Sequence, residues 1–267
     1  MFKIPEFKKH FLTIAIINIL ALIVAYYSLF LDVVLPIKAL IFLGLCFFPL
    51  LINFGYFWES IHNIIERRVE HEFTNVYSKN YKQSIIIELP ELNLFKLVWR
   101  GISGIVASIV VIIPISLLVY ISMTTNNAVN VQQNPMMQTV AIIFYSTFLP
   151  ALFWNYAKNN SIVSMLNIPK VVYIMGNYTL SYIVKTFAIV ALACVNSLID
   201  KFIVNQFGIL DVFSIWKDNA SLYEIFKTPD ASFLIILIFW AILQLKTFYF
   251  ALVNAYLLGT LVPCEEY

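Results

Sequence analysis

The longest uncharged stretch of the chain constrains its fold more than any other feature. Between Gly101 and Ala157, 57 consecutive residues include no Asp, Glu, Lys, Arg or His. A helix needs about 20 residues to cross the roughly 30 Å hydrocarbon core of a bilayer, so the stretch is too long for one span. The polar sequence TTNNAVNVQQNPMMQ interrupts it. The stretch therefore predicts two membrane-spanning helices joined by a polar turn.

Composition extends this interpretation to the whole chain. Apolar residues make up 61% of the 267 residues and charged residues 12%, whereas soluble domains average about 45–50% and about 25%. We therefore predict an all-α polytopic membrane protein, with one transmembrane domain over residues 1–267 and six transmembrane helices. The predicted spans are 11–31, 34–58, 101–123, 138–157, 179–199 and 233–258.

The distribution of basic residues predicts the orientation of these spans. The N-terminal segment and the connections after the second and fourth spans carry 11 Lys and Arg, whereas the opposite side carries three. Basic residues resist translocation, so both termini are predicted to be cytoplasmic, in the plasma (inner) membrane. The formal net charge of +2 gives no basic surface for nucleic acid. The expected partners are membrane lipid and another membrane protein or a cytoplasmic ATPase.

Prolines and small residues predict how the central spans bend and pack. Pro49, Pro114 and Pro150 lie inside the second, third and fourth spans, where each removes a backbone hydrogen bond and favours a kink. In the third span, Gly101 and Gly104 place small residues on nearly one face. Such a face is typical of close helix packing.

Two connecting segments have amphipathic character. Segment 200–230 is predicted to lie on the external membrane surface. Segment 59–95 is predicted to be a cytoplasmic amphipathic element, and its first part has helical periodicity with Glu59, His62 and Glu66 on the polar face. Glu-x-x-His is also an iron-binding element of helix bundles, but those bundles use it twice and this chain has it once. We therefore prefer a solvated charged face to a metal site.

A short internal repeat links the second and third spans to the fourth and fifth. The sequence LNLFKLVW from Leu92 matches LNIPKVVY from Leu166 at four of eight positions, and each copy precedes a span from the cytoplasmic side. Upstream, Trp58 and Trp154 each follow a Phe near the end of a span. We interpret this pattern as a duplicated unit of helix, connection and helix.

The motifs NFGYFWESIHNIIERR, IELPELNLFKLVWRGISGIVA and NYAKNNSIVSMLNIPKVVYIMGN carry a family resemblance over about residues 10 to 260. In layout and motifs the chain resembles the multi-pass prokaryotic membrane family catalogued as domain of unknown function 4013 (DUF4013), which is related to the membrane domains of some glycerophosphodiester phosphodiesterases. The resemblance implies a six-span helical membrane protein. It implies no activity, because the family offers no catalytic residues to carry over.

A lysine inside the sixth predicted span is the main functional candidate. Lys246, Thr247 and Asn254 fall within about 100° of arc on that helix and form a candidate polar path. A lysine at a span centre costs roughly 2.5–3.5 kcal/mol on insertion scales. If the span is 233–253, Lys246 lies about 10 Å from the inner surface and snorkels, which we prefer. If the span is 238–258, Lys246 needs a cavity or carbonyl partners.

The sequence contains no Walker A, HExxH, GxSxG or GxGxxG motif, and it suggests no metal or cofactor ligand set. No Asp or Glu falls deep in a predicted span, so a proton relay of paired charges is not expected. We therefore predict a non-enzymatic scaffold, assembly factor or accessory subunit. The alternative is a small transporter or channel with a polar path along the sixth span. An intramembrane lipid-modifying enzyme has the least support.

Overall fold

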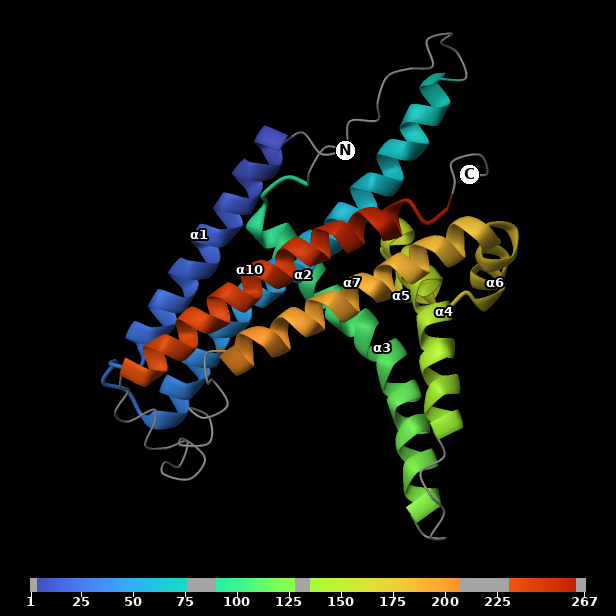
Figure 1. Ribbon diagram of the computed structural model, residues 1–267. Helices are drawn as coiled ribbons and strands as arrows, with labels where there is room; N and C mark the ends of the chain where they lie inside the picture. The colour runs from blue at the N-terminus through green and yellow to red at the C-terminus, as the bar shows by residue number, and fades with distance from the viewer. Residues whose placement is uncertain (1–3, 76–89, 128–134, 207–230, 263–267) are drawn as a thin grey trace.

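The computed structural model describes residues 4–75, 90–127, 135–206 and 231–262, and within them the protein is entirely helical, with no strand (Figure 1). The prediction of an all-α fold is therefore confirmed. The helices are α1 (Ile4–Ser28), α2 (Leu35–Asn75), α3 (Leu94–Asn127), α4 (Pro135–Asn159), α5 (Ile162–Met165), α6 (Ile168–Asn177), α7 (Thr179–Gln206) and α10 (Ala231–Gly259).

Five of these helices are long and apolar enough to cross a membrane, which supports membrane insertion of the chain. Their apolar segments are Lys9–Ser28, Leu35–Glu66, Leu94–Ile113, Thr179–Asn205 and Leu237–Gly259. The sixth predicted span, 138–157, coincides with helix α4. Much of α4 lies among residues whose side chains are not described, so the count of six spans stays a prediction.

Helix α2 is the centre of the bundle. It packs against α1, α3, α4 and α10, and α7 packs against α10, α4 and α6. Beyond this bundle α3 and α4 extend together, and their joined ends lie far from α1 (Figure 1). Three groups of buried apolar residues hold the arrangement together, and the largest has α4 at its centre and includes residues of α2, α3, α5, α6, α7 and α10.

The closest helix packing occurs between α2 and α3, and glycine makes it possible. A Cβ atom at Gly55 of α2 would overlap the carbonyl oxygen of Leu97, and one at Gly101 of α3 would overlap the carbonyl oxygen of Leu51. A Cβ at Gly104 would meet the indole of Trp58. The prediction of close packing through Gly101 and Gly104 is confirmed, because each position leaves no room for a side chain.

Both copies of the internal repeat begin a helix in the same way. The side chain of Asn93 accepts a hydrogen bond from the backbone N–H of Lys96, and that of Asn167 accepts one from the N–H of Lys170, each at 3.2 Å. These are N-caps, which satisfy an otherwise unpaired N–H in the first helical turn. The shared Leu-Asn sequence thus has a common structural role, which supports the interpretation of a repeat.

Helices α2 and α7 run furthest beyond the C-terminal ends of their predicted spans. Helix α2 continues without a break past residue 58 to Asn75, so the first part of segment 59–95 extends the second span. Helix α7 continues to Gln206, so residues 200–206 are helical. The remainder of the predicted external loop, 207–230, lies outside the described residues. Pro49 and Pro150 lie inside α2 and α4, and the predicted kinks stay predictions.

Candidate functional site

A pocket of about 280 Å³ lies between α2, α7 and α10. Helix α2 contributes Leu50, Asn53, Phe54 and Phe57, helix α7 contributes Ala193 and Asn196, and helix α10 contributes Gln244, Thr247, Phe248, Phe250, Ala251 and Asn254. All three helices include candidate membrane spans. The pocket therefore places uncharged polar groups among apolar side chains, within helices that are long and apolar enough to cross a membrane.

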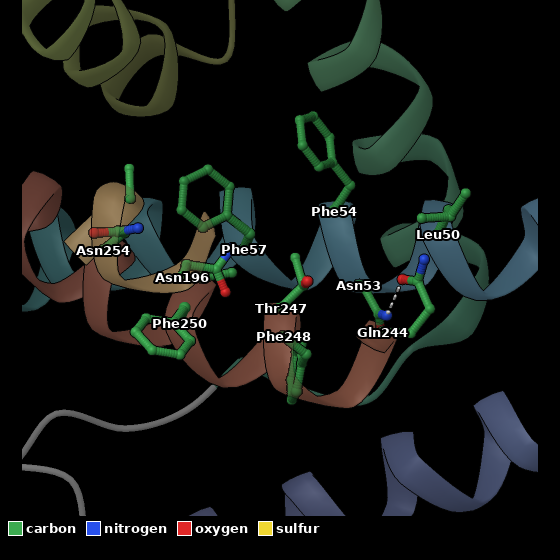
Figure 2. Close-up of a pocket in the computed structure, with 12 residues that line it drawn as sticks. Leu50, Asn53, Phe54, Phe57, Asn196, Gln244, Thr247, Phe248, Phe250 and Asn254 are labelled. Atoms are coloured by element: carbon green, nitrogen blue, oxygen red, sulfur yellow. Dashed lines mark hydrogen bonds between the residues drawn. The ribbon is translucent and has the colours of Figure 1, made fainter. Parts of the chain in front are cut away.

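The polar groups of the pocket divide into two sets, with Thr247 between them (Figure 2). At one end, the Asn53 amide nitrogen donates to Gln244 Oε1 at 3.4 Å. At the other end lie Asn196 and Asn254, whose Oδ1 atoms are buried and accept no hydrogen bond from the residues that the structure describes. A buried carboxamide oxygen without a partner costs about 1–3 kcal/mol. The second set is therefore the part of the pocket that is open to a ligand.

Two of the three predicted path residues line this pocket, and the third lies beside it. Thr247 and Asn254 are among the lining residues, whereas Lys246 is not. The Lys246 ammonium donates to the Asp200 carboxylate and, at 3.3 Å, to the backbone oxygen of Asn196. Its side chain is 13% exposed and that of Asp200 is 38% exposed. The functional role of the three residues stays a prediction.

Asp200 is a partner of Lys246 that the sequence pattern did not predict. The predicted fifth span ended at residue 199, so Asp200 was assigned to the external loop. Because α7 continues to Gln206, Asp200 remains on the helix and faces α10. Lys185, near the start of α7, donates to the backbone oxygen of Thr260 just after α10. The two lysine contacts thus fix α7 and α10 in an antiparallel arrangement.

A chain of amides connects the pocket to α1. Asn18 donates from Nδ2 to Asn53 Oδ1 at 3.3 Å, and Asn53 in turn donates to Gln244. Asn18 is completely buried. Amide contacts between helices are favourable in lipid because the alternative is an unsatisfied polar group. The chain of amides therefore joins α1, α2 and α10 through uncharged groups.

A buried carboxylate near the middle of α2 joins this helix to α3. Glu59 is 2% exposed, and its Oε2 accepts from Arg100 Nε at 2.9 Å. Lys96 Nζ lies 2.5 Å from the other oxygen. The expectation that Glu59 belongs to a solvated face is wrong, because the helical wheel of an isolated helix does not show that α3 covers this position. These three residues form an ion group in which the charge of Glu59 is paired with basic residues of α3. The charge therefore stabilises the packing of α2 against α3.

His62 likewise makes a structural contact. Its Nδ1 lies 2.9 Å from the backbone oxygen of Ala157 on α4, and its Nε2 lies 3.0 Å from Glu66. Within the described residues, no group of three His, Cys, Asp or Glu side chains could hold a metal ion. Glu59 and His62 therefore hold α3 and α4 against α2.

The second half of the repeat has a different polar arrangement. Asn155 follows Trp154 as Glu59 follows Trp58, and it is completely buried. Its two amide atoms have no hydrogen-bond partner among the described residues. The ammonium groups of Lys158 and Lys170 lie 5.2 Å and 5.9 Å from the centre of the Trp154 ring. The duplicated position thus holds a charge in one unit and an amide in the other.

Burial and the neighbouring charge of Lys170 lower the pKa of Lys158 to about 8. Lys158 lies one residue beyond the predicted span 138–157, at the C-terminal end of α4. Its contact with the Trp154 ring favours the charged form of the lysine. Burial disfavours that form, so the two effects on the pKa oppose each other.

No protein-family model matches the chain, and no curated protein or solved structure is detectably similar to it. The resemblance to the DUF4013 family therefore stays a prediction.

Sequence reasoning missed several residues of the pocket. Asn53, Asn196 and Gln244 were not among the predicted path residues. A signal was present: each is an uncharged polar residue within a predicted apolar span. Which of these amides would share a cavity depends on helix rotation and neighbours, and one sequence does not specify either.

Proposed function

We propose that this protein is a non-enzymatic integral membrane protein that serves as a scaffold, assembly factor or accessory subunit. Its partner would be another membrane protein or a cytoplasmic ATPase, and both termini would be cytoplasmic. The observation that carries the proposal is that charged side chains near and within the spans form ion pairs between helices. Glu59, Arg100 and Lys246 all contact charged groups of another helix. Charges engaged in helix packing support a structural role better than proton transfer or nucleophilic attack.

Helix α7 offers the surface on which we place the partner. Tyr182 and Thr186 of α7 are buried, but no residue of its most apolar window is buried by the part of the chain that the structure describes. Leu180 is 79% exposed and Phe187 is 73% exposed. Helices associate in lipid through side-chain packing, so a partner span could pack along this uncovered face.

Site-specific photo-crosslinking in native membranes tests this placement. A photoreactive residue at Phe187 should give a discrete adduct with a second protein. The same residue at Leu20 of α1, which is 54% exposed, is the matched control and should give adducts with lipid alone. Protein adducts at neither position, or the same protein adducts at both, would contradict the placement.

The pocket favours a second candidate, a small transporter or channel with a polar path along the sixth span. Thr247 and Asn254 face a cavity rather than lipid, as a path would require. Single-cysteine variants at positions 246, 247 and 254, made after replacement of the native cysteines, distinguish the candidates. An aqueous path predicts labelling by a water-soluble thiol reagent, and Lys246→Leu should then abolish flux. Uniform protection would favour the accessory subunit.

A further inference from the structure

The pocket between α2, α7 and α10 has the chemistry of a ligand site. We propose that it binds an uncharged hydroxyl group, and specifically the hydroxyl-bearing headgroup of a neutral membrane lipid such as a diacylglycerol. This inference goes beyond the proposed function, because it requires no protein partner.

The lining residues favour a neutral headgroup. Five uncharged polar side chains face the pocket, and among the residues that the structure describes no Asp, Glu, Lys or Arg lines it. The nearby Lys246 is engaged by Asp200, so it offers no free charge to a phosphate. A phosphate or ammonium headgroup would enter a low-dielectric site without a counter-charge, which is costly.

The unsatisfied amides favour a hydroxyl group in particular. The Oδ1 atoms of Asn196 and Asn254 are both buried without a donor among the described residues, and both side chains lie at the same end of the pocket (Figure 2). Each oxygen can accept an O–H. A hydroxyl both donates and accepts, so it matches a carboxamide whichever way the amide is turned. One hydroxyl can therefore donate to one carboxamide and accept from the other.

Size and access favour a group that is attached to a lipid. A volume of about 280 Å³ exceeds the roughly 30 Å³ that one water occupies in the liquid and accommodates a glycerol unit. Phe54, Phe57 and Phe250 supply an apolar wall around the amides. The pocket includes Ala193, which is exposed on α7 within the candidate span Thr179–Asn205. Entry from the lipid side therefore suits a headgroup with its acyl chains left in the bilayer.

Thermal unfolding of the purified full-length protein in detergent tests the proposal with three probes. Dioctanoylglycerol should raise the unfolding temperature with saturable concentration dependence. Dioctanoyl phosphatidic acid, with the same chains and a charged headgroup, should bind at least about tenfold more weakly. Free glycerol at the same concentrations should give no saturable rise. An equal response to phosphatidic acid would overturn the neutral headgroup, and a saturable response to glycerol would overturn the lipid source.

Two alanines of α10 provide matched variants. Ala251 lines the polar pocket, whereas Ala241 lines an apolar groove of about 250 Å³ between α1 and α10. Ala251→Leu should weaken dioctanoylglycerol binding by about tenfold or more because the new side chain fills the pocket. Ala241→Leu adds the same group elsewhere and should bind normally. Equal binding by both variants, or no response of the folded wild-type protein, would overturn the proposal.

Asn254→Leu separates binding from folding. It removes a buried amide with an unsatisfied oxygen, so the variant without ligand should unfold at the same or a higher temperature than the wild type. Its response to dioctanoylglycerol should be lost. A variant that keeps the full response would show that this amide does not contact the headgroup and would overturn the assignment.

Discussion

Arg100 and Lys96 contact the same carboxylate from different environments, and we expect their removal to have unequal effects. The Arg100 side chain is 10% exposed and that of Lys96 is 57% exposed. Arg100→Met leaves the buried Glu59 without its buried partner and should lower the free energy of unfolding by about 3–5 kcal/mol. Lys96→Met removes a screened contact and should cost at most about 1 kcal/mol. Unfolding of each variant in mild detergent, titrated with a denaturing detergent, measures both free energies.

The double variant Glu59→Leu with Arg100→Leu is the control for this prediction. It removes both charges together, so it should cost less than Arg100→Met alone. Equal losses from the two single variants would show that burial does not distinguish the two basic residues.

Because of Lys158, the free energy of unfolding should change with pH in the alkaline range. Because its pKa is lowered from 10.5 to about 8, the folded protein binds fewer protons than the unfolded chain between these values. Stability therefore rises as pH increases through this window, and the penalty for the charged lysine is fully present below about pH 8. Lys158→Met should abolish this rise.

Unfolding measured at pH 7, 8, 9 and 10 compares the two proteins. Lys158→Arg is a second control, because arginine keeps its charge throughout this range. A wild-type profile that coincides with that of Lys158→Met would contradict the prediction.

At this scale the sequence is informative about which residues are unusual and less so about their partners. It singles out Lys246 because a charge inside an apolar span is costly. Asp200 lies 46 residues away in sequence, and it becomes available because α7 continues beyond residue 199, where the predicted span ended. Glu59 was assigned to the wrong face because that assignment depends on what packs against α2.

At the scale of helices, the close packing of α2 against α3 predicts that Gly55 does not tolerate a larger side chain. Gly55→Ala should lower the free energy of unfolding by about 1–3 kcal/mol or more, because the new methyl group overlaps the Leu97 carbonyl and the helices must separate. Gly44 lies in the same helix with no atom within 4 Å of its Cβ position. Gly44→Ala should therefore be neutral or stabilise by up to about 1 kcal/mol, through helix propensity alone.

The same unfolding assay measures both variants, and they differ only in what the added methyl group meets. Similar stabilities for the two alanine variants would show that α2 and α3 are further apart than the structure places them.

Elements were the level best predicted from the sequence. A run of about 20 apolar residues has few alternatives in lipid, because only a helix satisfies the backbone within one segment. The ends of the helices were less predictable. Helix α2 continues to Asn75 through charged residues that the hydropathy pattern does not include, and helix continuation there depends on contacts such as that of His62 with α4.

The arrangement of the whole molecule depends on a topology that reporter fusions can test. Reporters attached at Met1 and after Tyr267 should both be active on the cytoplasmic side, and one inserted near Ala128 should be external, because 11 of the basic residues outside the spans fall on one side. Fusions after Lys96 serve as a cytoplasmic control. An external reporter after Tyr267 would show an odd number of spans.

The amide chain through α1, α2 and α10 has a consequence for how the molecule is made. Asn18 and Asn53 are 35 residues apart, so they can meet as soon as the second helix has entered the membrane, whereas Gln244 follows Asn53 by 191 residues. For most of synthesis, one side-chain N–H of Asn53 therefore has no hydrogen-bond acceptor, because Gln244 has not yet been made and lipid offers none. A chain interrupted before its last helix carries this defect in every copy, and only synthesis through α10 removes it.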